Sequence, residues 1–152
     1  MVLPIRLVPD PILREVCAPV DRGADVSGLA RDMLATMYAA PGRGLAAPQI
    51  GEGLRLFVMD CSWKEGLPDP RVFVNPVIID RSGSQTNEEG CLSLPDVPRL
   101  VARADRVTLA FDGPRGQRTE VFEGLAAACV QHEVDHLDGV LITDHPEAPL
   151  GP

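Results

Sequence analysis

The chain has 152 residues, of which 45% are hydrophobic and 24% are charged, and its formal net charge is −8. This composition is typical of a globular protein, and the length predicts a single domain over residues 1–152. The apolar runs are too short to span a bilayer and no dense Lys/Arg cluster offsets the negative charge, which argues against a membrane protein and against direct binding of nucleic acid.

The first half of the chain predicts two helices followed by strands. A short helix is expected to begin at Asp10-Pro11, with the aspartate as N-cap and the proline at the first helical position. A longer helix begins at Ser27, follows a three-to-four spacing of apolar residues, and is stopped by Pro41-Gly42. Pro76 predicts either an edge strand or a break. The strands, rich in β-branched and aromatic residues, are Leu54–Met59, Val72–Val74 and Val77–Ile79.

The second half predicts short strands and then a final helix. Turn-like pieces such as Asp112-Gly113-Pro114 separate these strands and indicate antiparallel hairpins. The last helix begins near Gly124 and ends close to Gly139. Strands between an N-terminal and a C-terminal helix, without βαβ alternation, predict an α+β fold with antiparallel strands around the C-terminal helix. The strands are Leu100–Ala102, Val107–Phe111 and Arg118–Phe122.

The cysteines and the N-terminus both bear on the compartment. Four cysteines fall at irregular spacings without a Cys-x-x-Cys pair: Cys17, Cys61, Cys91 and Cys129. A domain of this size does not need a disulfide framework, so reduced thiols are expected. The N-terminus also lacks the pattern of a secretion or import signal, and we therefore expect a cytoplasmic protein.

Two of the three histidines form a spacing that suits a metal. In the segment Gln131–His136, His132 and His136 are four residues apart, which on a helix places them on one face with Cβ atoms about 5–6 Å apart. Glu133 borders this face and could take a proton from a metal-bound water. Upstream, Cys91 is a candidate third ligand, because it lies in a polar turn that contains glycine. The pattern predicts a metal hydrolase.

The third histidine, His145, lies in a Pro-rich tail and is expected to be a solvated surface residue without a functional role. Asp135 lies one residue before a candidate ligand and is expected to be structural, orienting a partner or capping a turn.

Three segments, in this order, resemble the peptide deformylase family: Gly42–Gln49, Glu89–Ser93 and Gln131–Leu137. The flanking Asp10–Arg14 and Arg103-Ala104 are also similar, so the resemblance covers nearly the whole chain. It implies an enzyme that removes the formyl group from the N-terminal formylmethionine of newly made peptides and releases formate.

The resemblance also implies one divalent metal ion, bound by Cys91, His132 and His136. The family typically uses Fe(II) and accepts Zn(II) or Ni(II). Independently of the family, a thiolate with two imidazoles suits these metals better than Mg²⁺ or Ca²⁺. Three protein ligands with an open fourth position are typical of a catalytic centre rather than a structural one.

Roles in catalysis and substrate binding follow from the same resemblance. Glu133 would carry a proton to the departing amine, while the Gln49 side-chain amide and the Leu92 backbone N–H would stabilise the developing oxyanion. Gly44 and Gly90 would let the substrate backbone approach closely. Further residues expected near the substrate are Arg43, Leu125 and Cys129, of which Cys129 could equally be a packed core thiol.

The chain departs from the family pattern at Arg43 and Asn87, where relatives usually carry aliphatic residues. A more polar pocket could alter specificity, or the Arg43 guanidinium could turn to solvent and leave only its stem facing the ligand. The segment after His136 is too short for the basic C-terminal helix that some bacterial members use at the ribosome, so docking by that route is not expected.

Besides a deformylase acting on N-formylmethionyl peptides, three alternatives remain open. The first is a deformylase-like amidohydrolase for another N-acyl substrate. The second is a non-catalytic, metal-stabilised binding protein, against which the intact Glu133 argues. The third is a zincin-type endopeptidase, which would need a third metal ligand in the short tail downstream of His136.

Overall fold

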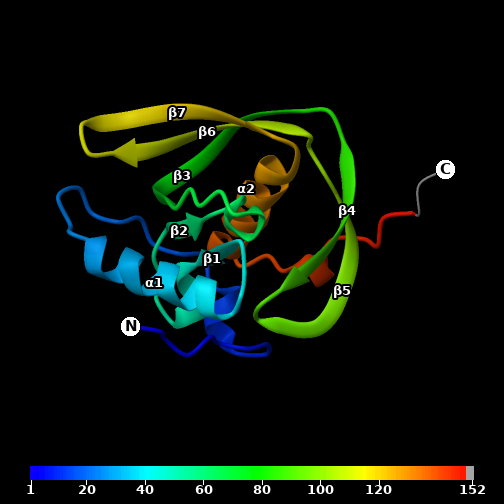
Figure 1. Ribbon diagram of the computed structural model, residues 1–152, viewed down its shortest axis with the longest axis horizontal. Coiled ribbons are helices and arrows are strands. Elements are labelled where there is room, and N and C mark those ends of the chain that lie inside the picture. The colour runs from blue at the N-terminus through cyan, green and yellow to red at the C-terminus, as the bar shows by residue number, and fades with distance from the viewer. Residues whose placement is uncertain (150–152) are drawn as a thin grey trace.

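The computed structural model describes residues 1–149, and the last three residues of the expected domain lie outside them. Two antiparallel sheets form the body of the fold, and helix α2 (Gly124–Leu137) packs against the larger sheet (Figure 1). The larger sheet has the order β1-β2-β3-β6-β7, and the smaller one pairs β4 with β5. The α+β prediction is confirmed. The strands are β1 (Gly44–Ala46), β2 (Leu56–Met59), β3 (Arg71–Ser82), β4 (Gln85–Cys91), β5 (Leu94–Arg103), β6 (Arg106–Gly113) and β7 (Gly116–Glu123).

The helices follow the predicted starts and stops. Helix α1 spans Ser27–Ala39, and α2 ends just before Gly139, whose φ of +74° suits glycine. The short helix after Asp10 is a 3₁₀ turn, in which the Asp10 carboxylate accepts a hydrogen bond from the Ile12 N–H at 3.1 Å. No helix within residues 1–149 is long and apolar enough to cross a membrane. The 3₁₀ turns are η1 (Pro11–Arg14), η2 (Ala47–Ile50), η3 (Trp63–Glu65) and η4 (Ile142–Asp144).

Strand β3 joins two strands that the sequence predicts separately. It lies between β2 and β6, but its pairing with β2 ends at Val74, so Pro76 lies where β3 no longer has β2 as a neighbour. The pairing with β6 also shifts in register between Val74 and Val77, which is the break that the sequence predicts as the alternative to an edge. Proline has no N–H to donate to a ladder, so it is tolerated inside the sheet only where the pairing is irregular.

The core under α2 is built from four aromatic rings and the apolar face of the helix. Phe57 stacks on Phe73 at 4.9 Å between ring centroids, and Phe111 and Phe122 meet Phe73 edge to face. Each such buried side chain contributes roughly 1.5–3 kcal/mol. This packing fixes the rotation of α2 about its own axis, so that its polar residues face β4. The helix residues in this core are Ala127, Val130, Val134 and Leu137.

An ion pair braces the larger sheet across β6. Arg71 in β3 donates two hydrogen bonds to Glu120 in β7, at 2.9 and 2.6 Å, and its guanidinium lies over the Phe73 and Phe122 rings. The hydrogen bond from Arg71 lowers the pKa of Glu120. Because this pKa is lower in the folded state than in the unfolded state, the stabilisation is present above the ordinary value of 4.5 and is lost as the pH falls.

Glu120→Gln is therefore expected to reduce the free energy of unfolding by about 1 kcal/mol near neutral pH, since the pair is bidentate but partly exposed. The reduction should be smaller at about pH 3, because protonation of Glu120 weakens the pair as the pH falls below its ordinary pKa. Urea unfolding of the two proteins at both pH values measures this difference. An equal difference at the two pH values would show that the charge of Glu120 is not its cause.

Candidate metal centre and active site

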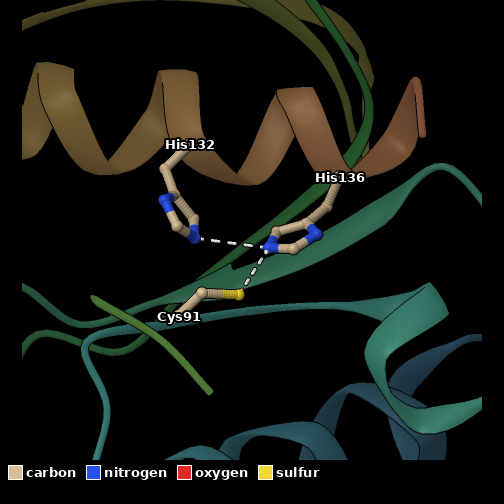
Figure 2. A group of neighbouring side chains, drawn as sticks. All are labelled: Cys91, His132 and His136. Atoms are coloured by element: carbon tan, nitrogen blue, oxygen red, sulfur yellow. Dashed lines mark hydrogen bonds between the residues drawn. The ribbon is translucent and has the colours of Figure 1, made fainter. Parts of the chain in front are cut away.

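Three candidate metal ligands meet where α2 faces the end of β4 (Figure 2). Cys91 is the last residue of β4, and His132 and His136 lie one turn apart on α2. The Cys91 Sγ lies 3.4 Å from His136 Nε2, and the two Nε2 atoms are 3.2 Å apart. All three ligand atoms lie within 4.8 Å of one another, and Cys91 and His136 are buried.

The separations of these atoms fit a single metal ion. In a tetrahedral site with ordinary metal–nitrogen and metal–sulfur bonds, neighbouring ligand atoms are about 3.3–3.6 Å apart. The distances of 3.2 and 3.4 Å match this within a few tenths of an ångström. One thiolate and two imidazoles form a donor set for a borderline or soft divalent metal, and three ligands leave a fourth position for water or substrate.

Glu89 orients one of the histidines. Its Oε1 lies 2.9 Å from His132 Nδ1, and because a carboxylate can only accept, the Nδ1 carries the proton and the Nε2 lone pair is left for a metal. Arg103 in β5 donates to both Glu89 oxygens, at 2.5 and 2.8 Å. Burial opposes ionisation of Glu89, but the hydrogen bonds from His132 and Arg103 prevail and lower its pKa to about 2.

The sequence did not predict that Glu89 and Arg103 belong to the site. A signal for Glu89 exists, because it lies two residues before Cys91 and side chains two apart in a strand point to the same face. Arg103 also donates to Asp135 at 3.0 Å, which confirms that Asp135 orients a partner. The expectation that His145 is a solvated surface residue is wrong, because it is half-buried with Nε2 2.8 Å from the Asp135 carboxylate. This contact with Asp135 depends on how the C-terminal segment that contains His145 folds back toward α2.

Glu133 is buried beside the ligands. Its Oε1 has no hydrogen-bond partner among residues 1–149, and its Oε2 lies 4.0 Å from the Cys129 Sγ. Burial raises the pKa of Glu133 to about 7. A carboxyl group that binds and releases a proton near neutral pH is suited to general acid–base chemistry.

The Gln49 amide is held with its N–H group toward the ligands. Its Oε1 accepts from the Ala46 N–H at 3.0 Å, which fixes the orientation of the amide. Its Nε2 lies 3.1 Å from Ser93 Oγ and 3.8 Å from Cys91 Sγ. Ser93 is fully buried and is a residue of the site that the sequence did not single out. Gln49 thus presents a donor next to the ligand cluster.

A cavity of about 500 Å³ opens onto Cys91, His132 and Glu133, within the size range of small-ligand sites. Arg43 lines the cavity, and its guanidinium Nη2 lies 3.0 Å from Oε1 of the exposed Glu65. Leu125 lies at the exposed mouth, and Asn87 also lines the wall. All the residues expected at the substrate or at the oxyanion line this cavity: Arg43, Gly44, Gln49, Gly90, Leu92, Leu125 and Cys129.

Known proteins that are similar to this chain are peptide deformylases, as the residues of the site indicate. The polypeptide deformylase family model matches residues 2–149. A peptide deformylase from Mesorhizobium japonicum is 50% identical over 145 residues, which cover 93% of this chain and 82% of that protein. The crystal structure of peptide deformylase from Thermotoga maritima has a TM-score of 0.90 at 38% identity and covers 98% of this chain and 99% of its own.

A further solved structure is a peptide deformylase from Acinetobacter baumannii with Met-Ala-Ser bound. It is 34% identical, has a TM-score of 0.87, and covers 96% of this chain and 99% of its own. The likeness thus extends over almost every residue that the structure describes, and the chain belongs to the peptide deformylase family.

Proposed function

We propose that this chain hydrolyses the formyl amide at the N-terminus of newly made formylmethionyl peptides, giving formate and a free amine. The observation that carries this function is the buried Glu133, which shares one cavity with Cys91 and His132 of the ligand cluster in a chain of this family. The presence of this acid–base group speaks against a non-catalytic binding protein. The zincin alternative loses its basis, because the third member of the cluster is Cys91, which lies upstream.

Cys91, His132 and His136 would hold the metal ion. When bound, a divalent metal polarises the formyl carbonyl and makes water more acidic, which is the chemistry that an amide hydrolase needs. We propose Fe(II) in the cell, with Zn(II) or Ni(II) able to replace it, because thiolate and imidazole ligands accept all three.

The protein's own groups would handle the proton and the developing charge. Glu133 takes a proton from the attacking water and delivers it to the departing amine nitrogen, and a pKa near 7 suits both transfers. The Gln49 Nε2 and the Leu92 backbone N–H donate to the formyl oxygen as it gains negative charge. Each such donor is worth about 2.7–4 kcal/mol of transition-state stabilisation.

The cavity wall would bind the peptide. Leu125, Cys129 and the stem of Arg43 contact the methionine side chain, and the paired Arg43 guanidinium stays at the rim. Gly90 leaves room for the peptide backbone, because a Cβ built there meets no atom within 4 Å. Gly44 is needed for a different reason, since a Cβ there would lie 2.6 Å from Glu133 Oε2.

We also propose that the chain acts in the cytoplasm, where new peptides are made. Its net charge of −8 would be repelled by ribosomal RNA, so we expect it to meet peptides without stable docking on the ribosome.

Removal of the metal is expected to abolish formate release from formyl-Met-Ala-Ser, and addition of Ni(II) is expected to restore it. Cys91→Ser should bind less metal and release formate at least about 100-fold more slowly, since a hydroxyl is a much poorer ligand than a thiolate. Metal content and formate release are measured on the same samples. Full activity in a protein shown to be free of metal would contradict the proposed function.

A further inference from the structure

A pair of thiols lies at the cavity wall, outside the ligand cluster. Cys129 in α2 lines the cavity and is partly exposed to it, and Cys61 follows β2. Each thiol shifts the pKa of the other through a side-chain hydrogen bond, and both side chains pack against the same apolar core. All four cysteines of the chain are free.

The pairing of β1 with β2 places these thiols together. The Arg43 carbonyl accepts a hydrogen bond from the Asp60 N–H at 2.8 Å, which fixes the position of the residue after Asp60. The Cys129 Sγ lies 3.9 Å from the same carbonyl oxygen. The Arg43 carbonyl thus contacts both the Cys129 thiol and the backbone next to Cys61, which brings these two segments of the chain together.

The two thiols differ in their acidity. The hydrogen bond from Cys129 lowers the pKa of Cys61, although burial opposes this. The same hydrogen bond, together with burial and the nearby Glu133, raises the pKa of Cys129 well above its usual value. A thiol with a lowered pKa beside one with a raised pKa is the arrangement of an attacking and a resolving cysteine.

We propose that Cys61 and Cys129 are a modification site that forms a reversible disulfide on reaction with a peroxide. The Cys61 thiolate attacks one peroxide oxygen, the O–O bond breaks, and the leaving hydroxide is protonated to water, so that Cys61 becomes a sulfenic acid. The Cys129 sulfur then attacks the Cys61 sulfur, and the S–O bond breaks with release of a second water. Two thiols and one hydrogen peroxide thus give one disulfide and two waters, and a dithiol reductant reverses the change.

The disulfide would also affect turnover, a consequence that, unlike the disulfide itself, rests on the proposed function. The Cys129 Sγ lies 4.0 Å from Glu133 Oε2. Disulfide sulfurs are about 2.05 Å apart, so the Cys129 sulfur must move toward Cys61, and its proton near Glu133 is lost. Because catalysis is sensitive to small displacements of a reacting group, we expect a fall of about three- to tenfold in formate release.

The test uses Zn(II)-loaded protein, in which Cys91 is coordinated and the metal does not react with peroxide. After treatment with hydrogen peroxide and blocking of free thiols, mass spectrometry of the digest should show a peptide that joins Cys61 to Cys129 and separates again with dithiothreitol. Cys61→Val, which has a similar size, is the matched control. It should keep the basal formate release, form no such link, and lose less activity with peroxide than the unmodified protein does.

Mass spectrometry of the digest tests the disulfide even if the protein releases no formate. A cysteine oxidised singly without a link, or a link that joins Cys91 instead, would overturn the proposed disulfide. Formation of the link with unchanged formate release would overturn its effect on turnover.

Discussion

Glu133→Gln is expected to lower kcat for formate release by about 10²–10⁴-fold, because the amide has almost the same shape but cannot accept or deliver the proton. The metal ligands on either side of it, His132 and His136, keep their positions, so metal content should not change. The free energy of unfolding should stay the same or rise, since the substitution removes a carboxyl that is buried at some cost.

Formate assays, metal analysis and thermal unfolding are done on the same preparation. Together they separate an effect on turnover from effects on metal binding and on stability. A variant that loses metal or unfolds would show that Glu133 has a structural role. A variant with full metal and nearly full kcat would show that another group transfers the proton.

Gly44→Ala is expected to reduce kcat/KM by about 100-fold, because a displacement of about 1 Å at a reacting group has effects of this size. The new Cβ would lie 2.6 Å from Glu133 Oε2 and 3.0 Å from Cys129 Sγ, so the Glu133 carboxylate must move. The crowding should also reduce the free energy of unfolding by about 1–3 kcal/mol.

Gly90→Ala is the matched control for stability, since its Cβ meets no atom within 4 Å. Its free energy of unfolding should stay within about 0.5 kcal/mol of the unmodified protein. Chemical denaturation and steady-state kinetics measure both variants. Wild-type turnover in Gly44→Ala would mean that the position of Glu133 seen here is not the one used in catalysis.

The sequence predicted the helices better than the strands. Both ends of α2 were predicted, because Gly124 and Gly139 bound a run with a clear apolar face. Strand β4 was missed, because Gln85–Cys91 is almost entirely polar and forms a strand through its pairing with β5 rather than through its own propensity. Strand β1 has only three residues, too few to show a period.

The sequence predicted the residues of the site that lie within its motifs. His132, His136 and Glu133 follow from helix spacing, whereas the place of Cys91 beside them rested on resemblance to a family. Contacts between distant segments could not be predicted, because they depend on sheet pairing and on the path of the tail. Examples are Arg103 on Glu89, and the Arg99 Nε that donates to the His145 carbonyl at 3.1 Å.

The most direct test of deformylation is the stoichiometry of the reaction. Ni(II)-loaded protein is incubated with formyl-Met-Ala-Ser, and formate and free N-terminal amine are both measured, with acetyl-Met-Ala-Ser as the matched substrate. We expect one formate for each new amine and little reaction of the acetyl peptide. No formate from fully metal-loaded protein, or faster cleavage of the acetyl peptide, would contradict it.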